Sequence, residues 1–370
     1  MIKVLHYVSI MNRAGQETFL MNMYRKIDRK KIQFGFLCTV DEEGDYDAEI
    51  KELGGEIYHF SLSAAGGAAG QIRNYKAVKH AFRKYTDEYD IIHIHNYHAF
   101  DMTLSAIAAL RAGAKKVVVH SHNSSADYHM ELHKVFRPII SHLPVTRLAC
   151  TQDAGKWMYT TNDFQVISNG IDVEKFKYNS KIRDQVRTEL GLKEKFVIGH
   201  VGRFNLQKNH EYLLRIFKEV QQKTPNIKLL LLGEGELFSK IQNLAEDLEI
   251  KDKIIFAGVH KDVENYYQAM DAFVLPSLFE GLPVTGIEAQ YSGLPCFFSD
   301  EVTREVKICS DTKFLKIGNE NLGLWVDAIS QQRINKERNK IELITKKFDI
   351  RTAAKSMEKR YIDLWKQSNS

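Results

Sequence analysis

The chain has 370 residues, which exceeds one ordinary domain and suits two domains of roughly 170 to 200 residues. Its composition, 44% hydrophobic and 27% charged, is that of a folded globular protein and excludes a disordered chain. The formal net charge of +5 is too small to indicate a nucleic-acid partner, although it is compatible with weak attraction to an anionic membrane surface.

Neither a membrane span nor a secretion signal is predicted. No apolar run approaches the ~18 residues that a span needs, and Arg13 interrupts the one N-terminal segment that could act as a signal peptide. The four cysteines are widely spaced, which indicates reduced cysteines rather than disulfides or a metal site. We therefore expect a cytoplasmic protein.

Strands and helices alternate along the first half of the chain. The apolar runs predict strands at 2–8, 32–39, 57–60, 90–95, 115–120 and 147–151, and helices at 16–26, 47–53, 71–85 and 153–159. Such alternation is typical of a parallel, doubly wound sheet. Gly15 lies between the first strand and the first helix, where such a sheet has its phosphate loop, but the Gly-x-Gly-x-x-Gly pattern of dinucleotide sites is absent. An ordinary helix-entry turn is an equally good interpretation of Gly15.

Asp45 and Asp47 form an Asp-x-Asp pair, a pattern that binds a divalent cation in some transferases. Here the pair precedes the predicted helix at 47–53, where N-capping and compensation of the helix dipole explain both carboxylates. We therefore predict no metal site, and no motif indicates a cofactor.

Residues 127–142 alternate apolar side chains, among them Leu132 and Val135, with basic ones. Pro138 is expected to break or kink this helix near its end. A surface helix that meets lipid or an acceptor and a helix that faces the core both fit the pattern. The basic face of the helix at 71–85 is expected to be solvated.

The second half repeats the alternation after an Asn- and Gly-rich turn near residue 172. Strands are expected at 195–201, 228–232, 254–259, 272–275 and 294–298, and a last amphipathic helix at 346–365. We expect domains at 1–172 and 173–347, followed by a separate C-terminal segment at 348–370.

The stretch 278–293 carries the most chemistry. Pro276 should end the strand at 272–275, and Pro283 should occupy the first position of a helix that Gly293 stops. The N–H groups of Gly281, Leu282, Val284 and Thr285 would then form an anion site at the helix N-terminus. Glu280 and Glu288 flank that site, and carboxylates accept hydrogen bonds from sugar hydroxyls. A nucleotide sugar combines a diphosphate with hydroxylated rings and fits both features.

The loop after the strand at 195–201 contains two cations, Arg203 and Lys208, at the expected carboxyl end of that strand. A guanidinium offers a planar fork for phosphate, and an ammonium adds a point charge. Exposed loop cations are the alternative interpretation. Together with the glutamate pair, a role in binding a diphosphate is favoured.

Glu280 and Glu288 form a Glu-x7-Glu pattern within Phe-Glu-Gly-Leu-Pro, and residues 202–209 match Gly-Arg-x-x-x-x-Lys-Asn. With these motifs the chain resembles the retaining family-4 glycosyltransferases of GT-B fold, of the exopolysaccharide and capsule type, over its whole length. The resemblance implies two facing Rossmann-like domains with a deep interdomain cleft. It also implies an acceptor-side first domain, a second domain that binds the nucleotide sugar, and a C-terminal helix that crosses back to the first domain.

The resemblance also implies roles for single residues. Arg203 and Lys208 would hold the donor diphosphate and stabilise the leaving group, while Glu280 would bind donor-sugar hydroxyls and Glu288 the nucleotide ribose. The segment around His260 would contact the base through its backbone. Gly15 would approach the donor, in a turn where Ala14 replaces one family glycine.

A histidine after the strand at 115–120 would also reach the donor. His122 is the better match and His120 the second choice. A side chain at the carboxyl end of a parallel strand faces the ligand crevice, whereas one earlier in the strand is usually core. His93 is therefore expected in the core, and His95 is left open.

The implied activity is the metal-independent, retaining transfer of a hexose-type sugar. The donor would be a UDP-sugar, or secondarily a GDP-sugar, and the acceptor a saccharide or polyprenyl-linked saccharide in surface-polysaccharide biosynthesis. Peripheral contact with the cytoplasmic face of the membrane would suit the mild basicity. The alternatives are a sugar-nucleotide epimerase or phosphorylase of the same fold, or a non-catalytic nucleotide-sugar-binding module. Turnover without an acceptor would favour the epimerase, and binding without turnover would favour the module.

Overall fold

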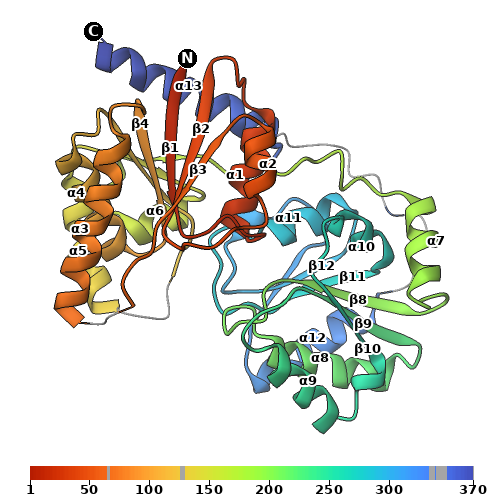
Figure 1. The fold of residues 1–370 in the computed structure, drawn as a ribbon. Coiled ribbons are helices and arrows are strands. Elements are labelled where there is room, and N and C mark those ends of the chain that lie inside the picture. Colours follow the sequence, from red (N-terminus) through yellow and green to blue (C-terminus); the bar gives the residue numbers. More distant parts are fainter. Residues whose placement is uncertain (65–66, 126–129, 333–337, 339–347, 370) are drawn as a thin grey trace. The chain divides into compact units, whose positions relative to one another are not determined.

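The computed structural model describes residues 1–64, 67–125, 130–332, 338 and 348–369. Its contacts divide the chain into two units, Met1–Gly170 with Lys347–Ser370, and Ile171–Lys346. Each unit is an α/β sandwich around one parallel sheet (Figure 1). Among the described helices, none is long and apolar enough to cross a bilayer.

The first unit contains a seven-stranded parallel sheet in the order β3-β2-β1-β4-β5-β6-β7. Its strands are β1 (Ile2–Val8), β2 (Ile32–Cys38), β3 (Glu56–His59), β4 (Ile91–Asn96), β5 (Val117–Ser121), β6 (Thr146–Ala149) and β7 (Gln165–Val166). Its helices are α1 (Gly15–Lys26), α2 (Asp47–Glu52), α3 (Gly67–Tyr85), α4 (Ala99–Ala112), α5 (Met130–His142), α6 (Gln152–Met158) and α13 (Ile350–Asn369).

Two hydrophobic clusters cover the two faces of this sheet. Helices α3, α4 and α5 pack on one face with Phe82 and Met102 in the core, and α1 and α13 pack on the other with Phe19 and Met357 (Figure 1). Gly170 explains how the last helix joins this unit, because a Cβ atom there would lie 2.6 Å from the Ile350 Cα. Only glycine permits that close approach of two backbones.

The second unit contains a six-stranded parallel sheet in the order β10-β9-β8-β11-β12-β13. Its strands are β8 (Phe196–Val201), β9 (Ile227–Leu232), β10 (Ile254–Gly258), β11 (Ala272–Leu275), β12 (Cys296–Ser299) and β13 (Lys313–Leu315). Its helices are α7 (Ser180–Glu189), α8 (His210–Lys223), α9 (Phe238–Asp247), α10 (Val263–Ala269), α11 (Val284–Tyr291) and α12 (Leu322–Ser330), with 3₁₀ turns at Lys251–Lys253, Arg304–Val306 and Asn319–Asn321. The α/β class and the two Rossmann-like sheets predicted from the sequence are confirmed.

Two local expectations were wrong in part. Tyr46 and not Asp47 occupies the N-cap of α2, although Asp47 lies in the first turn, where its carboxylate compensates the helix dipole as expected. Asp47 is buried, and its carboxylate bonds the His59 ring at 2.9 Å. Pro138 does not break α5, which continues to His142, and a kink there stays a prediction. The part of the predicted amphipathic segment at 127–129 lies outside the described residues.

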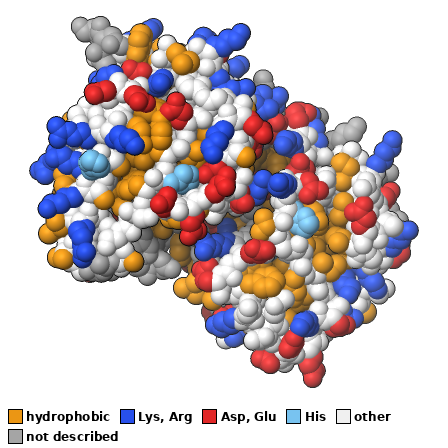
Figure 2. Space-filling model, in the orientation of Figure 1, with side chains coloured by type: hydrophobic (Ala, Val, Ile, Leu, Met, Phe, Trp, Pro, Cys, Tyr) orange, Lys and Arg blue, Asp and Glu red, His pale blue; other side chains and the backbone are white. Residues whose placement is uncertain are grey.

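Surface charge is mixed. In Figure 2 acidic and basic side chains are interspersed, and basic ones gather along the edge where Figure 1 shows α3. The basic side chains of α3 at Arg73, Lys76, Arg83 and Lys84 are exposed, which is the solvated face expected from the sequence.

Candidate functional site

The site in the second unit begins where β8 and β11 lie side by side. From β8 the chain continues to β9 and β10 on one side of β8, and it then returns to form β11 on the other side. The strand order therefore reverses between β8 and β11. In open parallel sheets, ligands bind outside the carboxyl ends of the strands at such a reversal. The loops after these two strands, 202–209 and 276–283, are the ones that hold the predicted motifs.

Backbone and side-chain hydrogen bonds join the two loops. The Leu278 N–H donates to the Gln207 carbonyl (2.8 Å), and the Asn209 side-chain amide donates to the Pro276 carbonyl (3.1 Å). Asn209 itself adopts a left-handed conformation with φ of 55°, at the N-cap of α8. The two loops therefore act as one structural element, although they are far apart in sequence.

Lys208 and Glu280 form an ion pair at the centre of this element. The Lys208 ammonium lies 2.5 Å from Glu280 Oε1, and the exposed fractions of the two side chains are 15% and 7%. Ser277 Oγ donates to the same carboxylate oxygen (2.8 Å), and Gln207 Nε2 donates to the other (3.2 Å). A buried carboxylate is stabilised only where such partners replace the water that it loses. An ammonium has three N–H donors, so Lys208 can keep Glu280 and still bind an anion.

The N-terminus of α11 lies directly beyond Glu280. Pro283 is the N-cap of α11, and the first helical residue is Val284. The helix therefore begins one residue later than predicted. The Gly286 and Ile287 N–H groups both donate to the Pro283 carbonyl (3.0 and 3.2 Å), so those of Val284 and Thr285 precede the helical ladder. Leading N–H groups of a helix attract anions. The buried Thr285 Oγ1 also has no hydrogen-bond partner among the described residues.

Glu288 lies on α11 with 7% of its surface exposed. The Tyr267 hydroxyl, from α10, donates to its carboxylate (2.8 Å) and lies 3.2 Å from the Thr285 carbonyl. Burial raises the pKa of Glu288 to about 7, and the tyrosine bond only partly opposes this shift. Glu288 therefore changes charge near neutral pH.

Arg203 does not touch the Lys208–Glu280 pair. Its guanidinium Nε lies 3.2 Å from Glu236 Oε2, and both side chains are largely exposed, at 69% and 56%. The loop that carries Arg203 is held by the 233–236 loop, since Phe204 N–H donates to the Glu234 carbonyl at 2.8 Å. Because an exposed ion pair contributes little, Arg203 can exchange Glu236 for a phosphate at small cost.

His260 follows β10 and is half-buried. Its Nε2 is 2.8 Å from the Ala257 carbonyl, and its Nδ1 is 2.9 Å from the Tyr266 hydroxyl. Both ring nitrogens are thus engaged within this loop. The side chain shapes the loop, and a contact with a base would fall to the backbone, as the resemblance implied.

The predicted residues of the first unit, Gly15 and His122, lie at the carboxyl ends of β1 and β5. Gly15 is the first residue of α1, and a Cβ atom on it would meet nothing within 4 Å. His122 is half-buried, with its Nε2 2.8 Å from His95 Nδ1, and burial lowers its pKa to about 3. His120, the second choice, is completely buried within β5. His93 is core, as expected, and bonds the Tyr361 hydroxyl.

Several polar residues that surround the predicted ones were missed. Ser277 and Gln207 bond Glu280, and the buried Tyr267 bonds Glu288. Glu17 is buried beside Gly15, and burial raises its pKa to about 7. Ser277 lies three residues before Glu280, and Gln207 immediately precedes Lys208. Their proximity to the motif residues was the sequence feature that could have predicted their place in the site.

Among the residues that the structure describes, two groups of side chains could hold a metal ion, and both are in the first unit: His6, His93 and His95, and His95, His120 and His122. In the second unit, the Glu280 carboxylate is already neutralised by Lys208. The arrangement there can bind an anion flanked by hydroxyl groups through protein cations and N–H donors.

Comparison with protein families covers both units. Residues 182–349 match the family described as glycosyl transferases group 1, and residues 13–175 match glycosyltransferase family 4. The putative glycosyltransferase EpsF of Bacillus subtilis (strain 168) is 33% identical over 89% of this chain and 87% of its own length. The Escherichia coli UDP-Gal:alpha-D-GlcNAc-diphosphoundecaprenol alpha-1,3-galactosyltransferase is 29% identical over 81% of this chain and 79% of its own length.

Solved structures share the fold at low identity. Anabaena Alr3699/HepE in complex with UDP and glucose matches with a TM-score of 0.78 and 18% identity, covering 98% of this chain and 100% of that one. Sucrose-phosphate synthase from Thermosynechococcus elongatus matches with a TM-score of 0.75 and 16% identity, covering 99% and 100%.

Proposed function

Because this chain belongs to the family-4 glycosyltransferases, we propose that it transfers a hexose from a UDP-sugar to a saccharide acceptor, with retention and without a metal ion. The observation that carries the proposal is the Lys208–Glu280 pair beside the N-terminus of α11 at the strand reversal. It combines a cation, helical N–H groups and a carboxylate, as a diphosphate attached to a sugar requires. A GDP-sugar is the second choice of donor.

UDP is favoured by two similar proteins. The Escherichia coli relative is named for UDP-Gal, and the Anabaena structure contains UDP. In this chain the segment around His260 would contact the base through its backbone, because its ring nitrogens are already engaged.

Each residue has a proposed part in the transfer. Lys208, Arg203 and the leading N–H groups of α11 balance the charge that develops on the departing diphosphate. Glu280 accepts hydrogen bonds from donor-sugar hydroxyls, and Glu288 accepts them from the ribose. The bond from the anomeric carbon to the phosphate oxygen breaks, and a bond to the acceptor oxygen forms on the same face. The acceptor proton passes to the departing phosphate oxygen. Gly15 and His122 are assigned to contacts with the donor.

The acceptor is proposed to be a saccharide, free or polyprenyl-linked, in the synthesis of a surface polysaccharide. Support comes from a relative that acts on a diphosphoundecaprenol-linked sugar, and from a capsular polysaccharide glycosyltransferase of Staphylococcus aureus that is 24% identical over 79% of both chains. A lipid-linked acceptor would place the reaction at the cytoplasmic face of a membrane.

Helix α5 supports peripheral membrane contact. Leu132, Val135 and Ile139 are exposed at 38%, 61% and 41%, with Lys134 between them. Apolar and basic side chains together bind anionic lipid surfaces. Sedimentation with anionic vesicles should fall when Val135 and Ile139 are both replaced by serine. Equal sedimentation of the variant would exclude this helix as the contact.

The central test is donor binding and slow donor hydrolysis, measured with a panel of UDP- and GDP-sugars with and without EDTA. Glu280→Gln tests the site, and Lys240→Ala, which removes an exposed ion pair with Glu211, is the matched control. One preferred UDP-sugar, unaffected by EDTA and lost only in Glu280→Gln, is expected. The anomeric configuration of the product then tests retention. Turnover that stops on chelation would contradict the metal-independent mechanism.

The alternatives predict different outcomes in the same assay. An epimerase would convert the nucleotide sugar without any acceptor, and a phosphorylase would require inorganic phosphate. A binding module would retain the sugar nucleotide unchanged with every acceptor. The buried Glu280 beside Lys208 favours catalysis, because it holds a cation where the charge of a leaving diphosphate would develop.

A further inference from the structure

Five neighbouring histidines lie on one face of the sheet in the first unit. His6 of β1 is the register partner of His93 in β4, and His95 is the partner of His120 in β5. Residues two apart in a strand point to the same face, so His95 shares the face of His93. His122 follows two residues after His120. This is the face that α1 and α13 cover, since His93 contacts Tyr361 and His120 lies edge-on to Phe19.

These rings are held in a dry environment. His6, His93 and His120 are fully buried and His95 is 4% exposed. Little water therefore reaches their ring nitrogens.

The buried rings lack enough hydrogen-bond partners. Among the described residues, the Nε2 atoms of His6 and His93 have none, and neither ring nitrogen of His120 has one of ordinary geometry. The bonds present are His6 to His95 (2.9 Å), His95 to His122 (2.8 Å) and His93 to Tyr361 (2.6 Å). Buried polar atoms in native proteins are rarely left unpaired, so the unpaired Nε2 of His93 is open to a ligand.

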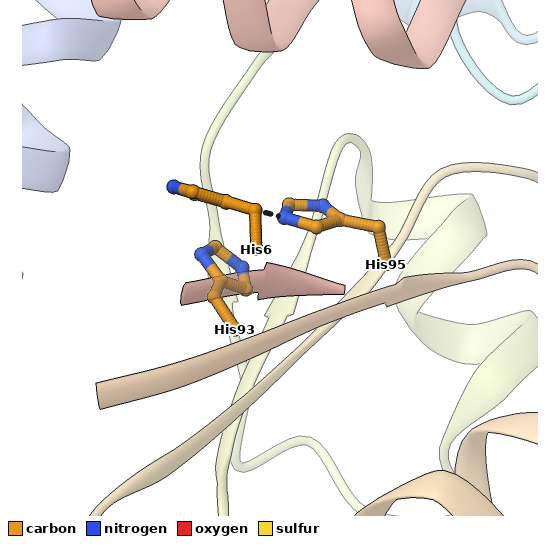
Figure 3. Close-up of side chains that lie close together, drawn as sticks. All are labelled: His6, His93 and His95. Atoms are coloured by element: carbon orange, nitrogen blue, oxygen red, sulfur yellow. Dashed lines mark hydrogen bonds between the residues drawn. The ribbon is translucent and has the colours of Figure 1, made fainter. Parts of the chain in front are cut away.

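We propose that His6, His93 and His95 bind a divalent transition-metal ion, with Zn²⁺ as the probe. Figure 3 shows the three rings close together, two of them from β4 and one from the neighbouring β1. One nitrogen from each ring lies within 4.8 Å of the other two. Imidazole nitrogens suit zinc, copper and nickel, whereas magnesium and calcium prefer oxygen.

Binding requires only small ring movements. Zinc–nitrogen bonds are about 2.0–2.1 Å, so ligand nitrogens around a tetrahedral ion lie about 3.4 Å apart. The rings would turn inward, and the His6–His95 hydrogen bond would give way to two bonds to the ion. His93 keeps its Nδ1 bond to Tyr361, which orients the ring and leaves Nε2 for the metal.

The second histidine group shares His95 but is less suited to a resident ion. His122, which we assign to the donor, is half-buried, whereas the first group is buried throughout. The proposed ion would have three protein ligands, and it does not depend on the proposed transfer reaction. A metal-free alternative is a row of hydrogen-bonded neutral rings from His122 through His95 to His6.

The test is the metal content of untagged protein from zinc-supplemented cultures, measured by mass spectrometry. Unfolded chain is also refolded with Zn²⁺ or with EDTA, because a buried ion must enter during folding. His93→Gln removes a ligand, and Tyr361→Phe removes only the hydroxyl that orients His93. His80→Gln, at an exposed position of α3, is the control for adventitious binding. Circular dichroism checks that each variant is folded.

The expected result is one zinc per chain in the wild type and in His80→Gln. His93→Gln should lose it, and Tyr361→Phe should bind roughly 10- to 100-fold more weakly. Zn²⁺ should also raise the melting temperature of the refolded wild type. Wild type without zinc after both treatments would overturn the proposal and leave the hydrogen-bonded row. Zinc retained equally by all folded variants would overturn it too. Donor binding is a separate readout, so failure here leaves the proposed function standing.

Discussion

The Lys208 ammonium contacts the Glu280 carboxylate at 2.5 Å, across 72 residues of sequence. Replacing Lys208 with methionine keeps the length of the side chain but removes the charge. We expect turnover to fall by about 10²–10³, the usual effect of losing one group that stabilises a developing negative charge. Stability should fall by about 1–3 kcal/mol, since Ser277 and Gln207 still partner Glu280. Steady-state kinetics and guanidine unfolding measure the two effects.

The double variant Lys208→Met with Glu280→Gln separates the pair from its members. Because the two side chains interact directly, their effects on stability should not add. The control is Lys240→Ala, which breaks an exposed pair and should change stability by less than about 1 kcal/mol. Additive effects in the double variant would mean that the pair is not coupled.

Glu288 makes stability depend on pH. Its carboxyl releases a proton at about 7 in the folded state, against an ordinary value of 4.5. The unfolded state thus ionises first, so the free energy of unfolding falls as pH rises from 4.5 through 7, by up to about 3 kcal/mol. Glu288→Gln should remove this fall. The difference in unfolding free energy between the variant and the wild type should therefore shift in favour of the variant from pH 5 to pH 8. Guanidine unfolding at both pH values tests it.

Glu246→Gln, which changes an exposed glutamate paired with Lys251, should leave the pH dependence unchanged. UDP affinity gives a second readout, since an ionised Glu288 accepts two hydroxyls better than a neutral carboxyl. Affinity should weaken below pH 7 in the wild type only. If Glu288→Gln changed the free energy of unfolding by the same amount at every pH, the buried carboxyl would be ionised throughout this pH range.

Two glycines should respond oppositely to alanine. A Cβ atom on Gly233, where φ is 131°, would lie 2.1 Å from the Gly202 carbonyl oxygen. Gly233→Ala should therefore cost more than about 2 kcal/mol, because a strained backbone and a clash coincide. A Cβ atom on Gly15 would have no neighbour within 4 Å. Gly15→Ala should therefore leave the free energy of unfolding unchanged or raise it by up to about 1 kcal/mol.

For Gly15 the informative measurement is kinetic. If Gly15 lets the backbone approach the donor, alanine should raise KM for the sugar nucleotide while thermal unfolding stays unchanged. An unchanged KM would mean that this is an ordinary helix-entry turn.

Buried histidines should make the protein acid-sensitive. The pKa of His200 is lowered to about 4 by burial, although its Nδ1 lies 2.8 Å from the Val274 carbonyl. Below the unfolded value of 6.5 only the unfolded state takes up the proton, so stability falls with acid by about 1.4 kcal/mol per pH unit. His200→Gln should lose less stability than the wild type between pH 6.5 and 5. The exposed His80→Gln should follow the wild type, and an equal acid response of all three would contradict this.

Much of the molecule could be predicted locally. The runs at 2–8, 195–201 and 272–275 formed strands because burial on both faces of a parallel sheet demands continuous apolar residues. The helix after Glu280 ended as expected, with Gly293 in the left-handed conformation at φ of 71°. The positions of Glu280 and Lys208 could be predicted because their motifs are contiguous and specific.

Local patterns failed where a distant partner decided the outcome. Asp47 looked like a helix cap but is buried against His59 of a neighbouring strand. Tyr267 belongs to no motif, yet its buried hydroxyl is bonded to Glu288 from another helix. The spacing of residues along one segment does not indicate which other segment packs against it.

The sequence by itself determined the α/β class, the alternation of elements, the family and the two loops of the candidate site, because periodicity and contiguous motifs are properties of single segments. The tertiary structure decided that Lys208 pairs with Glu280, that Arg203 instead pairs with Glu236, and that His6, His93 and His95 share one buried face. These contacts depend on which strands become neighbours. That order is set by the burial of whole faces of the sheet, and no single segment contains it.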